Sequence, residues 1–239
     1  SDGEYSPSTG EEFPLILPSY VNLAGQSQNE TIIDAQNSER IIQISSSSSS
    51  NPQSNSVSNL TIKNGSLLSC TWYCDDEGAG IYAKNSNLLL SNLNVENNYA
   101  ENGAGIYLSN VEGSLNSLNI NQNEGMRGAG IYLLNSSPQI SSCVVSNNSS
   151  RFPDYELPYN FDYTYSGLGI FMDNSSPILD SVDVHGNEIY FQNPYSTDEV
   201  ALGSGIAITN QSSPQVTTMS IYNNISNSDN INFDVDDLF

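Results

Sequence analysis

The sequence predicts an all-β solenoid, a stack of coils of about 25 residues that are each built from three short strands. Three observations lead to this fold class. A short glycine motif returns at a fixed interval, the apolar residues between its copies alternate with a period of two, and an Asn closes each unit. No segment shows the 3.6-residue apolar spacing that is typical of an amphipathic helix.

The motif Gly-x-Gly-Ile sets the period of the repeat. Its copies begin at residues 78, 103, 128, 167 and 203, so the first two intervals are 25 residues and the next two are 39 and 36. A single unit is too short to bury its own apolar side chains, whereas stacked units share one core. We therefore expect the motif's Ile residues to form one inward column, with coils about 4.8 Å apart. This column comprises Ile81, Ile106, Ile131, Ile170 and Ile206.

Two more alternating runs follow the motif in each unit. The final run places apolar pairs inward at Leu93/Val95, Leu118/Ile120, Cys143/Val145, Val182/Val184 and, after a shift of one residue, Met219/Ile221. The middle run is represented by Leu88/Leu90, Ile140, Leu179 and Val216. An Asn follows three residues after each final run: Asn98, Asn123, Asn148, Asn187 and Asn224. Asn suits a left-handed turn, and its amide can form hydrogen bonds from coil to coil.

The repeat divides the chain into a cap and a body. We expect residues 1–20 to form an N-terminal extension or cap and residues 21–239 to form the solenoid. Longer intervals predict insertion loops at about 66–77, 149–166 and 188–202, which all emerge from one edge of the stack. The final segment, INFDVDDLF, offers no obvious cap, so we expect either more chain beyond it or another subunit.

The segments TIIDAQNSERIIQIS and NLTIKNG, with repeated GAGIY and NSSPQI, resemble right-handed, single-stranded parallel β-helix proteins of the pectin-lyase-like superfamily. The likeness covers residues 20–239 and is strongest to non-catalytic surface proteins similar to polymorphic outer-membrane proteins and adhesins. It implies a right-handed helix with a structural or adhesive role at the cell surface. Because the superfamily also contains polysaccharide lyases and glycoside hydrolases, such an enzyme is the alternative function.

The residues themselves favour the non-catalytic reading. His185-Gly186 resembles an element of polygalacturonase-like enzymes, but their Asn-Thr-Asp and Arg-Ile-Lys elements are absent. Asp173, Asp180 and Asp183 share a unit yet lie on different stretches of it, whereas glycoside hydrolysis needs a pair of facing carboxyl groups. We therefore predict no catalytic residue, metal or cofactor, and we expect His185 in a solvated turn.

Composition narrows the classes of partner. The formal net charge is −22, from 27 acidic against five basic residues, and polarity comes mainly from 32 Asn and 40 Ser. This balance argues against binding to nucleic acid or to anionic membranes, because both need Lys and Arg. No apolar run approaches the roughly 18 residues that would span a bilayer. Neutral glycans, cations or a protein remain as partners.

Nine Asn-x-Ser/Thr sequons are consistent with a secreted, glycosylated protein, although chance alone would give about six or seven in a chain so rich in Ser. They lie at Asn29, Asn59, Asn64, Asn135, Asn147, Asn148, Asn174, Asn210 and Asn224.

The insertions are rich in aromatic residues, which makes their edge the candidate binding surface. Aromatic rings can stack on sugars or fill a partner's pockets, but they can also fasten long loops to the helix wall, and both readings stay open. The candidates are Trp72, Tyr73, Tyr155, Tyr159, Phe161, Tyr163, Tyr165, Tyr190, Phe191 and Tyr195. A separate stripe directly follows the motif's Ile residues (Tyr82, Tyr107, Tyr132 and Phe171), and we interpret it as a structural aromatic ladder.

The three cysteines separate into a close pair and a single residue. Cys70 and Cys74 flank Trp72 and can close a small disulfide loop, which suits an oxidising compartment. Cys143 stands at an inward strand position about 15 Å from Cys70, too far for a bridge, and is expected to be free and buried.

Overall fold

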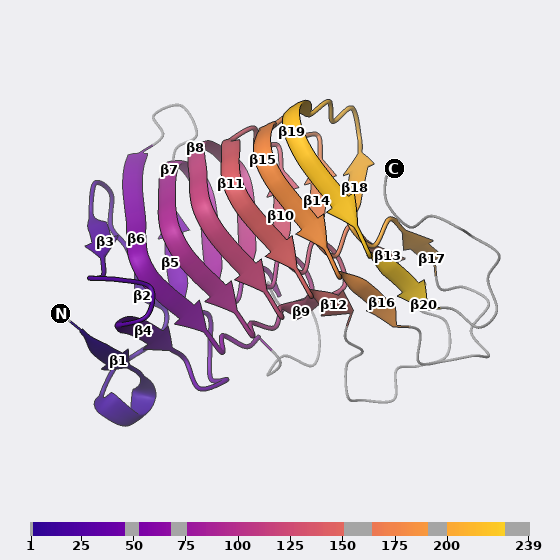
Figure 1. The fold of residues 1–239 in the computed structure, drawn as a ribbon. Coiled ribbons are helices and arrows are strands. Elements are labelled where there is room, and N and C mark those ends of the chain that lie inside the picture. The colour runs from indigo at the N-terminus through magenta and orange to yellow at the C-terminus, as the bar shows by residue number, and fades with distance from the viewer. Residues whose placement is uncertain (1, 46–52, 68–75, 151–163, 191–199, 228–239) are drawn as a thin grey trace.

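The computed structural model describes residues 2–45, 53–67, 76–150, 164–190 and 200–227. Within these ranges the chain is all-β apart from one 3-10 turn, and every recorded strand pair is parallel. One 14-stranded sheet is accompanied by sheets of four and two strands (Figure 1). The predicted all-β class with parallel strands is therefore confirmed.

The elements follow one another in this order: β1 (Gly3–Tyr5), η1 (Pro7–Thr9), β2 (Leu15–Ile16), β3 (Asn22–Ala24), β4 (Thr31–Asp34), β5 (Ile42–Ser45), β6 (Gln53–Lys63), β7 (Ile81–Glu96), β8 (Ile106–Asn121), β9 (Glu124–Gly125), β10 (Ile131–Leu134), β11 (Gln139–Ser146), β12 (Ser149–Ser150), β13 (Thr164–Ser166), β14 (Ile170–Asp173), β15 (Ile178–His185), β16 (Glu188–Tyr190), β17 (Val200–Leu202), β18 (Ile206–Thr209), β19 (Gln215–Tyr222) and β20 (Ile225–Asn227).

The motif's Ile residues are direct neighbours across strands, as the sequence predicts. Along β7, β8, β10, β14 and β18, the paired residues are Ile81, Ile106, Ile131, Ile170 and Ile206 in turn. All five are at most 2% exposed. The intervals of 39 and 36 residues leave this register unchanged, so the added residues are accommodated between strands rather than within them.

The final runs form a second layer, through β6, β7, β8, β11, β15 and β19, which Figure 1 shows side by side in front of β10, β14 and β18. Apolar side chains from both layers meet in one continuous core. The last pairing has a bulge, because Leu179 pairs with Val216 whereas Asp180 pairs with Thr218. The bulge is local, because Val182 pairs with Met219 at the same sequence offset as Leu179 with Val216. The predicted one-residue shift lies in the turn before β19, since Asp173 and its partner Thr209 are 36 residues apart whereas Ile178 and Gln215 are 37 apart.

The segment expected as a cap contributes the first strands of the large sheet. β1 pairs with β4 and β2 pairs with β5, both in parallel. Phe13, Leu15 and Leu17 pack against the core. The alternation in this segment thus places side chains over the first apolar layer.

A buried asparagine ladder runs along one corner of the stack. Its members, Asn98, Asn123, Asn148, Asn187 and Asn224, are at most 3% exposed. Asn123 Nδ2 donates to Asn148 Oδ1 at 3.0 Å and to the Val95 carbonyl at 3.0 Å. The Asn123 backbone N–H donates to the same Asn148 Oδ1 at 3.0 Å. The same pattern links Asn148 to Asn187 and Asn187 to Asn224, which confirms the predicted bonding from coil to coil.

The left-handed residue of this corner is the one before each ladder Asn, not the ladder Asn itself. All five corner residues have a positive, left-handed φ. The values are 54° at Asn97, 55° at Gln122, 54° at Asn147, 64° at Gly186 and 55° at Asn223. The chain therefore turns first and then directs the following amide inward, where it can bond to the next coil.

We predict that Asn148→Ala lowers the free energy of unfolding by about 3 kcal/mol, because it leaves two buried donors of Asn123 without an acceptor. The measurement is chemical denaturation of the full chain. The matched control is Asn147→Gly, one residue earlier on the exposed side of the corner, where glycine keeps the left-handed backbone and should cost less than about 1 kcal/mol. Equal losses in the two variants would contradict the ladder's role.

Candidate binding edge

The three insertions begin and end along one edge of the stack. Their starting points line up in a first root column, in which Ser66, Tyr99, Glu124, Ser149 and Glu188 pair successively. Their end points line up in a second root column, in which Glu77, Asn102, Arg127, Ser166 and Leu202 pair successively. The sheet β20-β16-β12-β9 follows this edge (Figure 1). Two coils cross between the columns without an insertion, so they lie between the inserted coils.

Most predicted aromatic candidates lie outside the described residues. These are Trp72, Tyr73, Tyr155, Tyr159, Phe161, Tyr163, Phe191 and Tyr195, and the same holds for Cys70 and Cys74. Tyr165 and Tyr190 can be placed.

Tyr165 does not belong to a binding surface. It is 0% exposed and packs with Ala129, Leu168 and Ile189 in a small apolar cluster beneath the edge. The end of the second insertion joins the parallel pair β13–β17, where Tyr165 lies beside Ala201. Because its ring is fully buried in this cluster, Tyr165 fastens the insertion to the wall, which corrects its assignment as a binding residue.

Tyr190 is the exposed aromatic residue at the root of the third insertion, with 45% of its surface accessible. Its backbone N–H donates to Ser150 Oγ at 2.7 Å, and Ser150 Oγ donates to the Tyr190 carbonyl at 3.0 Å. Its hydroxyl donates to the carboxylate of Glu188, and this hydrogen bond raises the pKa of Tyr190. The ring is thus held at the edge in a fixed position.

The tyrosine stack is a separate feature on the outer side of β7, β8, β10 and β14. Ring centroids are 5.6 Å apart from Tyr82 to Tyr107, 5.1 Å from Tyr107 to Tyr132 and 4.8 Å from Tyr132 to Phe171. The last three rings are only 4–7% exposed. At Gly103, where φ is +58°, a Cβ would lie 2.8 Å from the Cβ of Tyr107. The motif's first glycine therefore makes room for the stack, and the structural interpretation is confirmed.

Burial raises the pKa of two phenols in this stack and of one thiol in the main core. It raises the pKa of Tyr107, and the nearby Glu77 carboxylate raises it further by hydrogen bonding and charge repulsion. Burial also raises the pKa of Tyr132, against the opposing charge of Arg127. Cys143 is free and 0% exposed, as predicted, and burial raises its pKa to about 11. Its thiol is therefore protonated at neutral pH and unsuited to act as a nucleophile.

A polar cleft of about 440 Å³ lies at the corner of the asparagine ladder. One side carries four left-handed corner residues from successive coils, Asn37, Asn64, Asn97 and Gln122, with φ of 60°, 58°, 54° and 55°. The other side carries the first root column, with Ser66, Tyr99 and Glu124. Buried Asn98 completes the lining. The cleft therefore runs along the stack between two rows of side chains.

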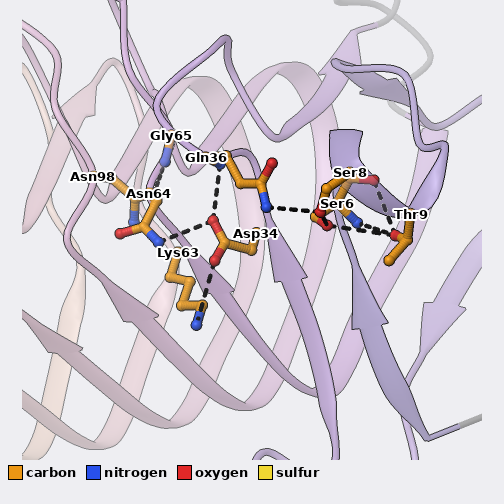
Figure 2. A network of polar contacts seen from close by, with 9 residues as sticks. All are labelled: Ser6, Ser8, Thr9, Asp34, Gln36, Lys63, Asn64, Gly65 and Asn98. Atoms are coloured by element: carbon orange, nitrogen blue, oxygen red, sulfur yellow. Dashed lines mark hydrogen bonds and ion pairs between the residues drawn. The ribbon is translucent and has the colours of Figure 1, made fainter.

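A network at the N-terminal end of the cleft fixes its first wall (Figure 2). Asn64 Nδ2 donates to Asp34 Oδ1 at 2.9 Å, and Lys63 Nζ lies 3.4 Å from Asp34 Oδ2. The backbone N–H of Gln36 donates to the same Asp34 Oδ1 at 2.8 Å. Asp34 is only 7% exposed, so its charge is compensated by these contacts and the side chain of Asn64 is held in place.

Two sequence expectations need correction at this edge. Asn148 and Asn224, predicted as glycosylation sites, are 0% and 3% exposed, and their amides are bonded within the ladder, which leaves no room for a glycan. Asn29, Asn135, Asn147, Asn174 and Asn210 are exposed, and Asn59 and Asn64 are half-buried. His185 is not in a solvated turn, because it ends β15 and its half-buried ring stacks on Tyr222 at 4.8 Å.

Comparison with protein families assigns this chain to one family. Residues 1–236 match the family described as Protein of unknown function (DUF1565). The chain belongs to the DUF1565 family. No curated protein and no solved structure matches it. Across the described ranges of this DUF1565 chain, none of the helical structure has the length and apolar character needed to cross a membrane.

Sequence reasoning missed the cleft and its residues Tyr99, Gln122 and Glu124. The available signal was Tyr99, an aromatic residue directly after a ladder Asn, where the next units carry Glu124, Ser149 and Glu188. A second signal was Gln122 at a corner that Asn or Gly occupies in the other units.

We predict that the DUF1565 chain loses stability as pH rises above about 10, and that Tyr107→Phe reduces this loss. A phenol whose pKa is higher in the folded than in the unfolded chain stabilises the fold below its unfolded value. That contribution disappears as pH rises through the folded value. Denaturation across alkaline pH measures the effect. The control is Tyr20→Phe at a ring that is 66% exposed, and identical pH profiles for the two variants would contradict the prediction.

Proposed function

We propose that this chain is a right-handed, single-stranded parallel β-helix with three strands per coil and about 25 residues in its shortest coil. It acts as an extracellular or cell-surface module that binds a glycan or a protein through the edge formed by its insertions. The handedness follows the resemblance to pectin-lyase-like repeat proteins. Support for the coil size comes from pairing between residues 25 apart along β7, β8 and β10.

The observation that carries the binding role is the alignment of all three insertion roots in two adjacent columns. A stacked sheet provides a rigid base, and segments of variable length on one edge of such a base are the usual location of binding residues. Exposed Tyr190 at a root, and the polar cleft beside the short coils, give this edge both aromatic and hydrogen-bonding groups. The net charge of −22 favours neutral or cationic partners.

A second function, as a building block of a larger assembly, is supported by the last coil. Val216 in β19 is 55% exposed, whereas its neighbour Leu179 in β15 is 1% exposed. Side chains that continue the core are therefore open to solvent at this end, where a second copy of the chain can cover them. Light scattering across protein concentrations tests this role, and Val216→Asn should weaken any oligomer that forms.

We propose a non-catalytic role for the described carboxylates. Incubation with polygalacturonate, alginate and neutral glucans, with and without calcium, should release no shorter products. Product release that a mutation at Asp173, Asp180 or Asp183 abolishes would favour the lyase or hydrolase alternative.

We predict that the full chain binds at least one member of a glycan array and that Tyr190→Ala weakens this binding by about tenfold, because an exposed ring at a partner surface contributes on the order of 1–2 kcal/mol. The matched control is Tyr20→Ala, an exposed ring at the other end of the stack. The binding role for this edge is rejected if both variants bind as the parent does.

A further inference from the structure

We propose that the corner cleft binds a neutral oligosaccharide laid along the stack, with one sugar unit facing each coil. This inference rests on the proposed glycan-binding function and assigns it a site and a ligand class. The cleft spans four coils, from Asn37 through Asn64 and Asn97 to Gln122, so its length suits a chain molecule rather than a single small ligand.

The lining has the chemistry that recognises sugar hydroxyl groups. The exposed amides of Asn97 and Gln122 each carry a carbonyl acceptor and two N–H donors, so they can bond to a hydroxyl in either sense. Half-buried Tyr99 adds an aromatic ring, and Glu124 adds a carboxylate acceptor. Among the residues that the structure describes, neither Lys nor Arg lines the cleft, and the chain carries a net charge of −22, so an anionic polysaccharide would be repelled.

The two rows are rigid and evenly spaced. Backbone hydrogen bonds between coils fix them: Asn37 N–H donates to the Asn64 carbonyl at 2.8 Å, and Tyr99 N–H to the Gly65 carbonyl at 2.8 Å. Glu124 N–H donates to the Asn98 carbonyl at 2.9 Å. Equivalent side chains therefore repeat at about the 4.8 Å strand spacing. A site held in this way loses little conformational entropy when a ligand binds.

Local backbone conformation accounts for the choice of Asn at position 97, but not for the amide of Gln122. Gly186 occupies the same corner position in a later coil, so the turn needs no amide there. Asn is common in the left-handed region, but Gln is not enriched there. Both side chains are exposed on the cleft side of the corner, where they can contact a ligand.

The test is calorimetric titration of the full chain with cellohexaose, xylohexaose and mannohexaose, and with hexagalacturonate and hexalysine as charged probes. The cleft variant is Asn97→Gly/Gln122→Gly, which keeps the left-handed backbone and removes two amides. The matched control is Asn147→Gly/Asn223→Gly, which makes the same change at the same corner beyond the cleft. Denaturation confirms that both variants fold.

We expect at least one neutral hexasaccharide to bind, the cleft variant to bind it about tenfold more weakly, and the control to remain within about twofold. Tyr99→Ala should also weaken binding. Equal affinities for the cleft variant and the control overturn the proposal. So does a result in which hexagalacturonate or hexalysine binds and none of the neutral hexasaccharides does. Lack of binding by all three neutral probes overturns it too. Should Tyr190→Ala abolish glycan binding while the cleft variant retains it, the edge keeps its proposed function and the cleft loses this role.

Discussion

The structure depends on side-chain amides that bond from one coil to the next inside a single corner. Each ladder Asn has its carbonyl oxygen and its Nδ2 engaged by neighbouring coils, with Asn148 Nδ2 bonding to Asn187 Oδ1 at 2.9 Å and to the Ile120 carbonyl at 3.3 Å. A slip by one residue would bury unpaired amide groups and turn every apolar side chain of the strand outward. The ladder and the apolar column at Ile131 therefore impose the same register.

This shared register explains how the chain accepts long insertions. Extra residues between Ser149 and Ser166 change the sequence interval but not the strand pairing, because the next ladder position, Asn187, receives the same bonds from Asn148. The residues added at this corner therefore lie on its outer side, while the inner side stays regular. The cleft lies on that outer side, so its polar rows inherit the spacing of the ladder beneath them.

Much of the fold could be predicted because its signals are periodic. The Ile column, the one-residue shift before β19 and the tyrosine stack all follow from counting residues. Residue spacing does not predict the direction in which a side chain points at a turn. A sequon carries no information about burial, so the glycosylation site predicted at Asn148 is wrong. Alternation alone likewise does not show that Tyr165 points into the wall. The cleft arises between rows from different coils and has no single-segment signature.

The most direct measurement of the central claim is hydrogen exchange of the Asn side-chain amides, followed by nuclear magnetic resonance on the full chain. The account predicts strong protection for the Nδ2 protons of Asn123, Asn148 and Asn187, each with contacts to the ladder Asn of the next coil, and rapid exchange for exposed Asn147. Ladder amides that exchange as fast as Asn147 would contradict it, since the coils would then be held in register by apolar packing alone.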